Sequence, residues 1–172
     1  MIRKSKNFVW PRKLYQKDRI QAENNLMKKY GLKNKREIWR TEAQVNYLRA
    51  RAKKLVNLSR EEQEIFIMNL KNLGLNVNSL TEVLALKVED LLKRNLISIV
   101  VSKNLANTHR QARQMISHKK IIVGDKMVGS PRYIVKVGEE DRIKVKDKIK
   151  KSGEKTNQKD IELMEGGADE RN

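Results

Sequence analysis

The sequence contains no cysteine and only two histidines among its 172 residues. Without cysteine the chain has no disulfide, no iron–sulfur cluster and no thiolate zinc site. His109 and His118 stand nine residues apart, and no carboxylate lies near them at the spacing of metal ligands. The sequence therefore predicts no metal site.

Long apolar runs are absent as well. The longest, residues 96–101, is six residues long and includes a serine, whereas a membrane-spanning helix needs about 20 apolar residues. Residues 1–10 carry basic charge but lack the apolar core of a signal peptide. We therefore expect a soluble protein of the cytoplasm that has no membrane partner.

Acidic residues are too few to balance the basic ones. Lys and Arg number 39 against 21 Asp and Glu, a formal net charge of +18. Residues 1–60 hold 18 basic and 4 acidic side chains, and residues 92–150 hold 15 and 5. Residues 61–91 hold 2 basic and 6 acidic side chains, and residues 151–172 hold 4 and 6. Two basic blocks around an acidic spacer predict two faces that meet one long polyanion.

Patterns typical of enzymes are missing too. The acidic clusters at residues 61–62 and 139–141 fall at a predicted helix start and a turn. A general acid and base pair needs a pocket that keeps two pKa values apart, and exposure to solvent at these places would make them similar. Gly124 and Gly129 have the spacing of a phosphate-binding loop, but Ser-Pro follows where that loop needs Lys and Ser or Thr. We therefore predict a binding protein with no catalytic residue and no cofactor.

The residue pattern predicts the α+β fold class: a helical N-terminal region, then a small helix-helix-β-hairpin module and a disordered acidic tail. Residues 1–16 are basic and lack apolar periodicity, so we expect an extended arm that orders on a partner. We expect Trp10 and Trp39 to pack within the protein, because tryptophans of this kind are packing residues more often than base-stacking ones. The other predicted parts are a helical N-terminal domain at 17–86, the module at 87–148 and the tail at 149–172.

Apolar periodicity predicts helices at residues 17–30, 36–57, 59–73, 87–102 and 108–118, with a short helical turn after Ser79. Capping boxes are predicted at Ser59 with Glu62, Ser79 with Glu82 and Thr108 with Gln111. Strands are predicted at 121–123, 133–137 and 142–145, with turns at 124–125 and 138–139.

The last predicted helix separates its side chains into two stripes. Ala112 and Ile116 fall on an apolar stripe, whereas Arg110, Arg113 and Ser117 share a polar one. Such a helix suits the major groove of DNA or the grooves and junctions of RNA. The hairpin directly behind it favours a platform that reads RNA shape.

Four runs in the second half together resemble a known family. They are LANTHRQARQMISH at 105–118, IIVGDKMV at 121–128, SPRY at 130–133 and DRIKV at 141–145. This pattern resembles the S-four-type RNA-binding domain. The runs YGLKNKREIWR at 30–40 and LALKVEDLL at 84–92, with Trp-Pro at 10–11, are similar to the archaeal and eukaryotic branch of the ribosomal small-subunit protein four family.

The resemblance implies a non-catalytic component of the small ribosomal subunit. It would bind small-subunit ribosomal RNA at a multi-helix junction early in assembly and contribute to translational accuracy near the mRNA entrance. Implied partners are neighbouring proteins, ribosomal protein five of the small subunit among them, and the mRNA itself. The sequence departs from the family at Asn95, where a second arginine is usual, and at His118-Lys-Lys120, where His-Gly-His is usual.

The predicted RNA-binding residues are basic and polar side chains on these segments. The resemblance places Thr108, Arg110, Arg113 and His118 on the RNA-facing edge and matches Arg94 to a family arginine. The other candidates in the second half are Lys103, Ser117, Lys119, Lys120 and Arg132. Those in the first half are Lys33, Lys35, Arg36, Arg40, Arg49 and Arg51, and those in the arm are Arg3, Lys4, Lys6, Arg12 and Lys13. On this hypothesis Arg113→Ala lowers RNA affinity and reduces the salt slope by about one contact.

Two alternatives stay open on the sequence. The same small module is appended to RNA-modifying enzymes such as pseudouridine synthases and to some aminoacyl-tRNA synthetases, and turnover on RNA would favour that class. A DNA-binding regulator with a helix-turn-helix is the other alternative. A duplex operator that outcompetes structured RNA at moderate salt would favour it.

Overall fold

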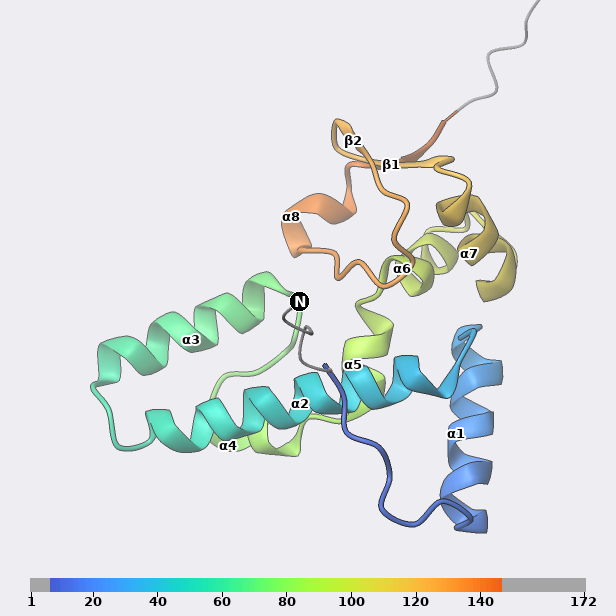
Figure 1. Ribbon diagram of the computed structural model, residues 1–172. Helices are drawn as coiled ribbons and strands as arrows, with labels where there is room; N and C mark the ends of the chain where they lie inside the picture. Colours follow the sequence, from blue (N-terminus) through green and yellow to red (C-terminus); the bar gives the residue numbers. More distant parts are fainter. Residues whose placement is uncertain (1–6, 147–172) are drawn as a thin grey trace, which may run out of the picture.

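The computed structural model describes residues 7–146 of the chain, and Figure 1 shows its arrangement. The first half is helical, with α1 (Lys17–Tyr30), α2 (Lys35–Leu55), α3 (Arg60–Asn72), α4 (Leu80–Ala85) and α5 (Val88–Lys93). The second half contains α6 (Leu96–Ser102), α7 (His109–Ser117), β1 (Ile121–Val123), β2 (Lys126–Met127), α8 (Val137–Glu140) and β3 (Ile143–Val145). The predicted α+β fold class is confirmed.

The long helix α2 organises the first half. Its buried side chains Val45, Ala52 and Leu55 recur on one face at the helical period, and they share a core with Phe66 and Leu70 of α3. In Figure 1, α1 lies across one end of α2, and α3 and α4 lie beside its other end. Burial of this apolar face fixes the helices against one another.

A smaller core joins the start of α2 to its neighbours. Tyr30 at the end of α1, Ile38 of α2 and Leu92 of α5 are buried together with Leu32. Gly31 makes the turn between α1 and α2 in the left-handed region, with φ of 58°. The packing therefore brings the C-terminal end of α1 next to α5, which leads directly into the second half.

The second half has a core of its own. Helix α6 buries Leu96, Ile97, Ile99 and Val100, which pack with α7 and with the sheet. The sheet is antiparallel with the order β2-β1-β3. The predicted turn at 124–125 is confirmed as the link between β1 and β2. Helix α7 packs against α6 and lies next to it in Figure 1.

The predicted continuous helix at 87–102 is wrong. Asn95 has extended backbone, with φ of −66° and ψ of 145°, and separates α5 from α6. The backbone there bonds to a distant segment: the Leu96 N–H donates to the Tyr133 carbonyl at 2.8 Å, and the Val135 N–H donates to the Arg94 carbonyl at 3.1 Å. These long-range bonds replace helical ones at the break.

The predicted strand at 133–137 and the turn at 138–139 are also wrong. Only Ile134 pairs in β fashion, with Asn95, and residues 137–140 form the short helix α8. The carboxylate of Glu139 accepts a bond from the Lys136 N–H at 3.4 Å and another from the Tyr133 hydroxyl at 2.8 Å. Local side-chain bonding therefore turns the chain where the apolar alternation suggested an extended strand.

The predicted caps have mixed outcomes. Ser79 and Thr108 each accept a bond from the backbone N–H three residues later, as predicted. Ser59 begins α3 but makes no side-chain cap bond. The Gln63 amide instead donates to the Leu55 and Leu58 carbonyls at 3.0 and 3.1 Å, and so satisfies the end of the preceding helix.

Part of the prediction lies outside the described residues. This applies to the tail at 149–172 and to Arg3, Lys4 and Lys6 of the predicted arm. The described part of the arm, residues 7–16, contains neither helix nor strand. The division of the chain into four parts stays a prediction. Between residues 7 and 146, no helix has both the length and the apolar character needed to cross a membrane.

Candidate nucleic-acid interface

Helix α7 has the two faces that its sequence predicts. Ala112 and Ile116 are fully buried, while Arg110 and Ser117 are exposed. The Thr108 hydroxyl accepts a bond from the Gln111 N–H at 3.2 Å, which fixes the first turn. One face of the helix is thus held by the core, and its opposite face stays open to a ligand.

The end of α7 adds lysines to this face. The Lys119 N–H donates to the Ile116 carbonyl and the Lys120 N–H to the Met115 carbonyl, both at 2.9 Å, which is a Schellman motif. Lys119 adopts φ of 54° at the position that most often holds glycine. The structure therefore places a lysine at the helix end despite the steric penalty of a left-handed backbone. We define the α7 edge as the exposed residues Thr108, Arg110, Ser117, His118, Lys119 and Lys120.

Arg113 does not lie free on the α7 edge. Its Nε donates to the Gly31 carbonyl at 3.0 Å, and its guanidinium pairs with the Glu37 carboxylate of α2. The Arg113 side chain is only 19% exposed. The placement on an open polar stripe is therefore corrected: tertiary contacts give this side chain a structural role, and an RNA contact by Arg113 stays a prediction.

Arg94 is also bound inside the protein. It donates to the Leu73 carbonyl at 2.9 Å and to the Val135 carbonyl at 3.0 Å, and it pairs with Glu140. A Cβ added at Gly74 would lie 2.3 Å from the Arg94 guanidinium carbon. Arg94 thus connects the end of α3 to α8, and it fits there because Gly74 has no side chain. Contact with RNA stays a prediction for Arg94 as well.

An aromatic cluster lies where the arm meets α2. Ring centroids of Trp10 and Trp39 are 5.2 Å apart, and those of Phe8 and Trp10 are 5.6 Å apart, so both tryptophans contact other rings of the chain, while Trp10 stays 46% exposed. The guanidinium of Arg36 lies 5.5 Å from the Trp10 ring, and that of Arg40 lies 5.6 Å from the Phe8 ring. The arm therefore supports two predicted RNA-binding arginines by cation–π contact.

Beneath this cluster, Glu23 of α1 is a buried carboxylate with three partners. Arg19 pairs with it at 2.9 Å and Lys35 at 3.2 Å, and the Trp39 indole N–H donates to it at 2.9 Å. Burial alone would raise the pKa of Glu23, but the bonds from Trp39 and Lys35 and the charge of Arg19 outweigh it and lower the pKa below 4.5. Glu23 is thereby kept ionised, and it engages Lys35, another predicted RNA-binding residue.

The remaining candidates differ in how they are held. Arg49 donates to the Leu86 carbonyl at 2.5 Å, Arg51 lies 5.3 Å from the Phe66 ring, and Lys103 pairs with Asp141 at 3.2 Å. Those that are exposed with neither an ion pair nor a cation–π contact to any residue between 7 and 146 are Arg12, Lys13, Lys33 and Arg132.

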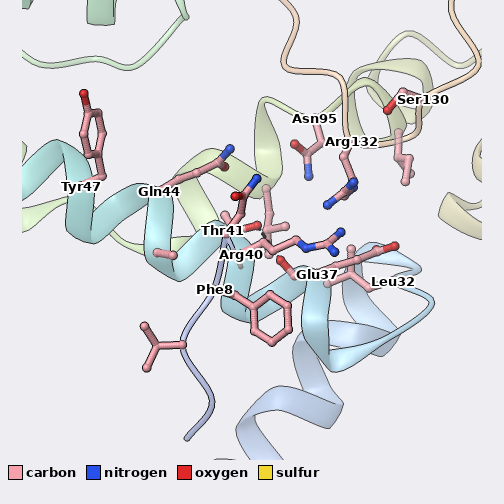
Figure 2. Close-up of a pocket in the computed structure, with 15 residues that line it drawn as sticks. Phe8, Leu32, Glu37, Arg40, Thr41, Gln44, Tyr47, Asn95, Ser130 and Arg132 are labelled. Carbon is pink, nitrogen blue, oxygen red and sulfur yellow. Dashed lines mark hydrogen bonds between the residues drawn. The ribbon is translucent and has the colours of Figure 1, made fainter. Parts of the chain in front are cut away.

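A groove of about 630 Å³ lies between the arm, α2 and residues 130–132. Figure 2 shows Arg40 of α2 and Arg132 pointing into it from opposite sides, with Asn95 beside them. Gln44 and Tyr47 also line the groove, although neither is among the predicted RNA-binding residues. Steps of four and three residues from Arg40 put both on the same face of α2, a signal that the sequence did contain.

The chain is similar in sequence to known proteins. The S4 domain family matches residues 94–141. The small ribosomal subunit protein uS4 of Nanoarchaeum equitans is 43% identical over 152 residues, covering 83% of this chain and 84% of that protein. The protein of the same name from Thermoplasma volcanium is 42% identical, covering 80% and 74%. That from Methanothermobacter thermautotrophicus is 40% identical, covering 80% and 84%.

The chain belongs to the uS4 family. The predicted resemblance to the small-subunit protein four family and to its RNA-binding domain is confirmed. In this uS4 family member, the S4 domain match begins at Arg94, continues through α6, α7 and the β1–β2 hairpin, and ends after α8. The match thus contains the whole α7 edge.

Proposed function

We propose that this protein is a structural, non-catalytic component of the small ribosomal subunit that binds small-subunit ribosomal RNA. The observation that carries the proposal is the α7 edge, where a capped helix and its lysine-bearing end stand open on a buried core. Arginine and lysine in this arrangement neutralise phosphates and position the RNA. The relatives that carry the ribosomal name support the assignment.

The finer role concerns where on the RNA the protein sits. The α7 edge and the basic residues Lys33 and Arg36 beside the Gly31 turn are held in one body by the Arg113 contacts. Two fixed basic faces suit a junction, where several RNA helices present phosphates at set angles. We propose that the protein binds such a junction early in assembly, in the cytoplasm, and contributes to accuracy near the mRNA entrance. Ribosomal protein five of the small subunit and the mRNA are its proposed further partners.

The residues divide by task in this proposal. Arg110, Lys119 and Lys120 contact phosphates directly, and Lys33, Arg36 and the arm lysines and arginines form the second contact face. Arg94 and Arg113 act as positioning residues, because their guanidinium donors already bond to protein acceptors. Arg49, Arg51 and Lys103 make smaller contributions, because each already has a partner within the protein: the Leu86 carbonyl, the Phe66 ring and Asp141, respectively.

Binding to transcribed small-subunit ribosomal RNA, measured across a range of salt concentrations, tests this function. We expect tight binding to that RNA and a steep salt dependence, with duplex DNA and transfer RNA as weak competitors. Co-sedimentation with small subunits in high salt, and release by ribonuclease, is the matching test in extracts. Preference for a DNA duplex, or isomerisation of uridine in the RNA, would support the alternatives instead.

A further inference from the structure

Asn95 is a buried polar residue without a hydrogen-bond partner for its side chain. It is 8% exposed, as are Thr41 and Ser98. Thr41 and Ser98 each donate their hydroxyl to a backbone carbonyl, at 2.9 and 2.7 Å. The Asn95 amide bonds to no residue between 7 and 146, although it lines the groove that Figure 2 shows. The polar atoms of this amide are not among the buried unpartnered atoms of the described chain, so they reach the groove and can bond to a ligand there.

Two cations enter the same groove. Arg40 comes from α2 and Arg132 from the loop after the hairpin, and neither forms an ion pair with any residue of the described chain. The Nε of Arg40 is buried and has no acceptor among these residues. Two guanidinium groups that face each other without a carboxylate between them repel, and an anion between them removes that repulsion.

The one carboxylate at the groove does not supply this anion. Glu37 lines the groove, but its charge is taken up by Arg113 in an ion pair where the Glu37 side chain is 14% exposed. The groove therefore presents a net positive charge, together with an amide that can donate one bond and accept another.

We propose that this groove holds one unpaired adenosine nucleotide of the bound ribosomal RNA. Its phosphate lies between Arg40 and Arg132, and its base presents N6 and N7 to the side-chain amide of Asn95. This inference rests on the proposed function and adds to it a place where the protein reads a base. In this proposal the α7 edge, by contrast, reads only phosphates and shape.

The chemistry and the size of the groove both select an unpaired nucleotide. An asparagine amide matches adenine, because its oxygen accepts from N6 and its nitrogen donates to N7. Proteins read RNA sequence mainly at bases that are splayed out of helices, and aromatic side chains stack on such bases. Tyr47 also lines the groove and is 64% exposed, but its ring lies at the end away from Asn95 (Figure 2). The volume of 630 Å³ lies within the range of about 300–1,000 Å³ that is usual for small-ligand sites.

Nucleotide-analogue interference with the full-length protein tests the inference. The probe is transcribed small-subunit ribosomal RNA that carries phosphorothioates with either adenosine or 7-deazaadenosine, which lacks the N7 acceptor. Bound and free RNA are separated and compared for the wild type, Asn95→Ala, Arg132→Ala and Lys54→Ala. Lys54→Ala is the charge-matched control, because Lys54 is exposed in the last turn of α2 and does not line the groove.

We expect one unpaired adenosine at which 7-deazaadenosine weakens binding of the wild type and of Lys54→Ala, but not of Asn95→Ala. Asn95→Ala should bind the unmodified RNA about tenfold more weakly. Arg132→Ala should lose the phosphorothioate effect at that same nucleotide and reduce the salt slope by about one. Because Arg132 is exposed, this second variant keeps its fold and tests the groove independently of Asn95.

Two results would overturn the inference while the proposed function stands. They are tight wild-type binding with no 7-deazaadenosine effect at any unpaired adenosine, and an effect that persists unchanged in Asn95→Ala. A wild-type protein that does not prefer small-subunit ribosomal RNA over transfer RNA would overturn the proposed function itself.

Discussion

Arg113 of α7 and Glu37 of α2 form an ion pair across 76 positions of the sequence. The same guanidinium donates to the Gly31 carbonyl at 3.0 Å, so one side chain binds both the turn after α1 and the start of α2. The contact joins the first basic block of the sequence to the second. It fixes the angle between two faces that we propose meet one RNA.

Replacement of Arg113 by alanine should lower the free energy of unfolding, with little change in the salt dependence of RNA binding. It leaves the mostly buried Glu37 carboxylate without its partner, which we expect to lower the free energy of unfolding by about 2 kcal/mol. Urea unfolding of the RNA-free protein measures this effect. The salt slope of RNA binding should stay close to that of the wild type.

Arg110→Ala is the matched control on the same helix. Arg110 is exposed, so its removal should change stability by less than about 0.5 kcal/mol while it reduces the salt slope by about one. If Arg113→Ala instead keeps full stability and loses one unit of slope, the sequence-based assignment of Arg113 as a phosphate ligand is the correct one.

Lys119→Gly should stabilise the protein and weaken its binding. The left-handed backbone at φ of 54° disfavours a side chain, and glycine should relieve about 1 kcal/mol of strain. The same change removes a charge from the α7 edge and should reduce the salt slope by about one. Thermal unfolding and filter binding on one protein preparation measure both effects.

Lys120→Gly provides the comparison for Lys119, because Lys120 has no positive φ. It should lose RNA affinity without any gain in stability. Equal stability changes in the two variants would show that the backbone at Lys119 is not strained.

Gly31→Ala should destabilise the joint between α1 and α7. The added Cβ would lie 2.8 Å from the Cβ of His109, at a backbone φ of 58°. We expect a loss of about 2 kcal/mol or more from the two effects together. Gly138→Ala is the control, since nothing lies within 4 Å of its added Cβ, and it should be neutral or slightly stabilising within α8. Urea unfolding distinguishes the two outcomes.

The ionised state of Glu23 should make stability depend on pH in the acid range. Burial opposes the charge of Glu23, but Trp39, Lys35 and Arg19 lower its pKa below 4.5. The stabilising contribution is therefore fully present above pH 4.5 and is lost as the pH falls through the lower pKa of the folded state. Glu23→Gln should be less stable than the wild type at neutral pH, and the difference should shrink as the pH drops below 4.5.

Glu42→Gln controls for the loss of a carboxylate in the measurement on Glu23. Glu42 is exposed on α2 and forms no ion pair with the residues at 7–146. Denaturant unfolding of the three proteins between neutral and acid pH checks the prediction. A stability difference between wild type and Glu23→Gln that does not change with pH would contradict it.

The spacing of apolar residues along the sequence was enough to predict the helices that bury one face. Val45, Ala52 and Leu55 repeat on one face of a long helix, and Ala112 and Ile116 on one face of a short one, so α2 and α7 followed from spacing alone. The hairpin at Gly124 followed from turn chemistry. The family also followed from short runs of sequence, because residues 105–118 and 30–40 keep their order and spacing.

Contacts between distant segments decided what the sequence could not. The break at Asn95 arises from hydrogen bonds to Tyr133 and Val135, which no local window contains. Charge and spacing put Arg94 and Arg113 among the RNA-binding candidates, but only the fold brings Glu140 and Glu37 to them. The sequence determined how much positive charge the protein carries and on which helices. Tertiary packing decided which of those charges are bound internally and which stay open, because an ion pair depends on distance in space.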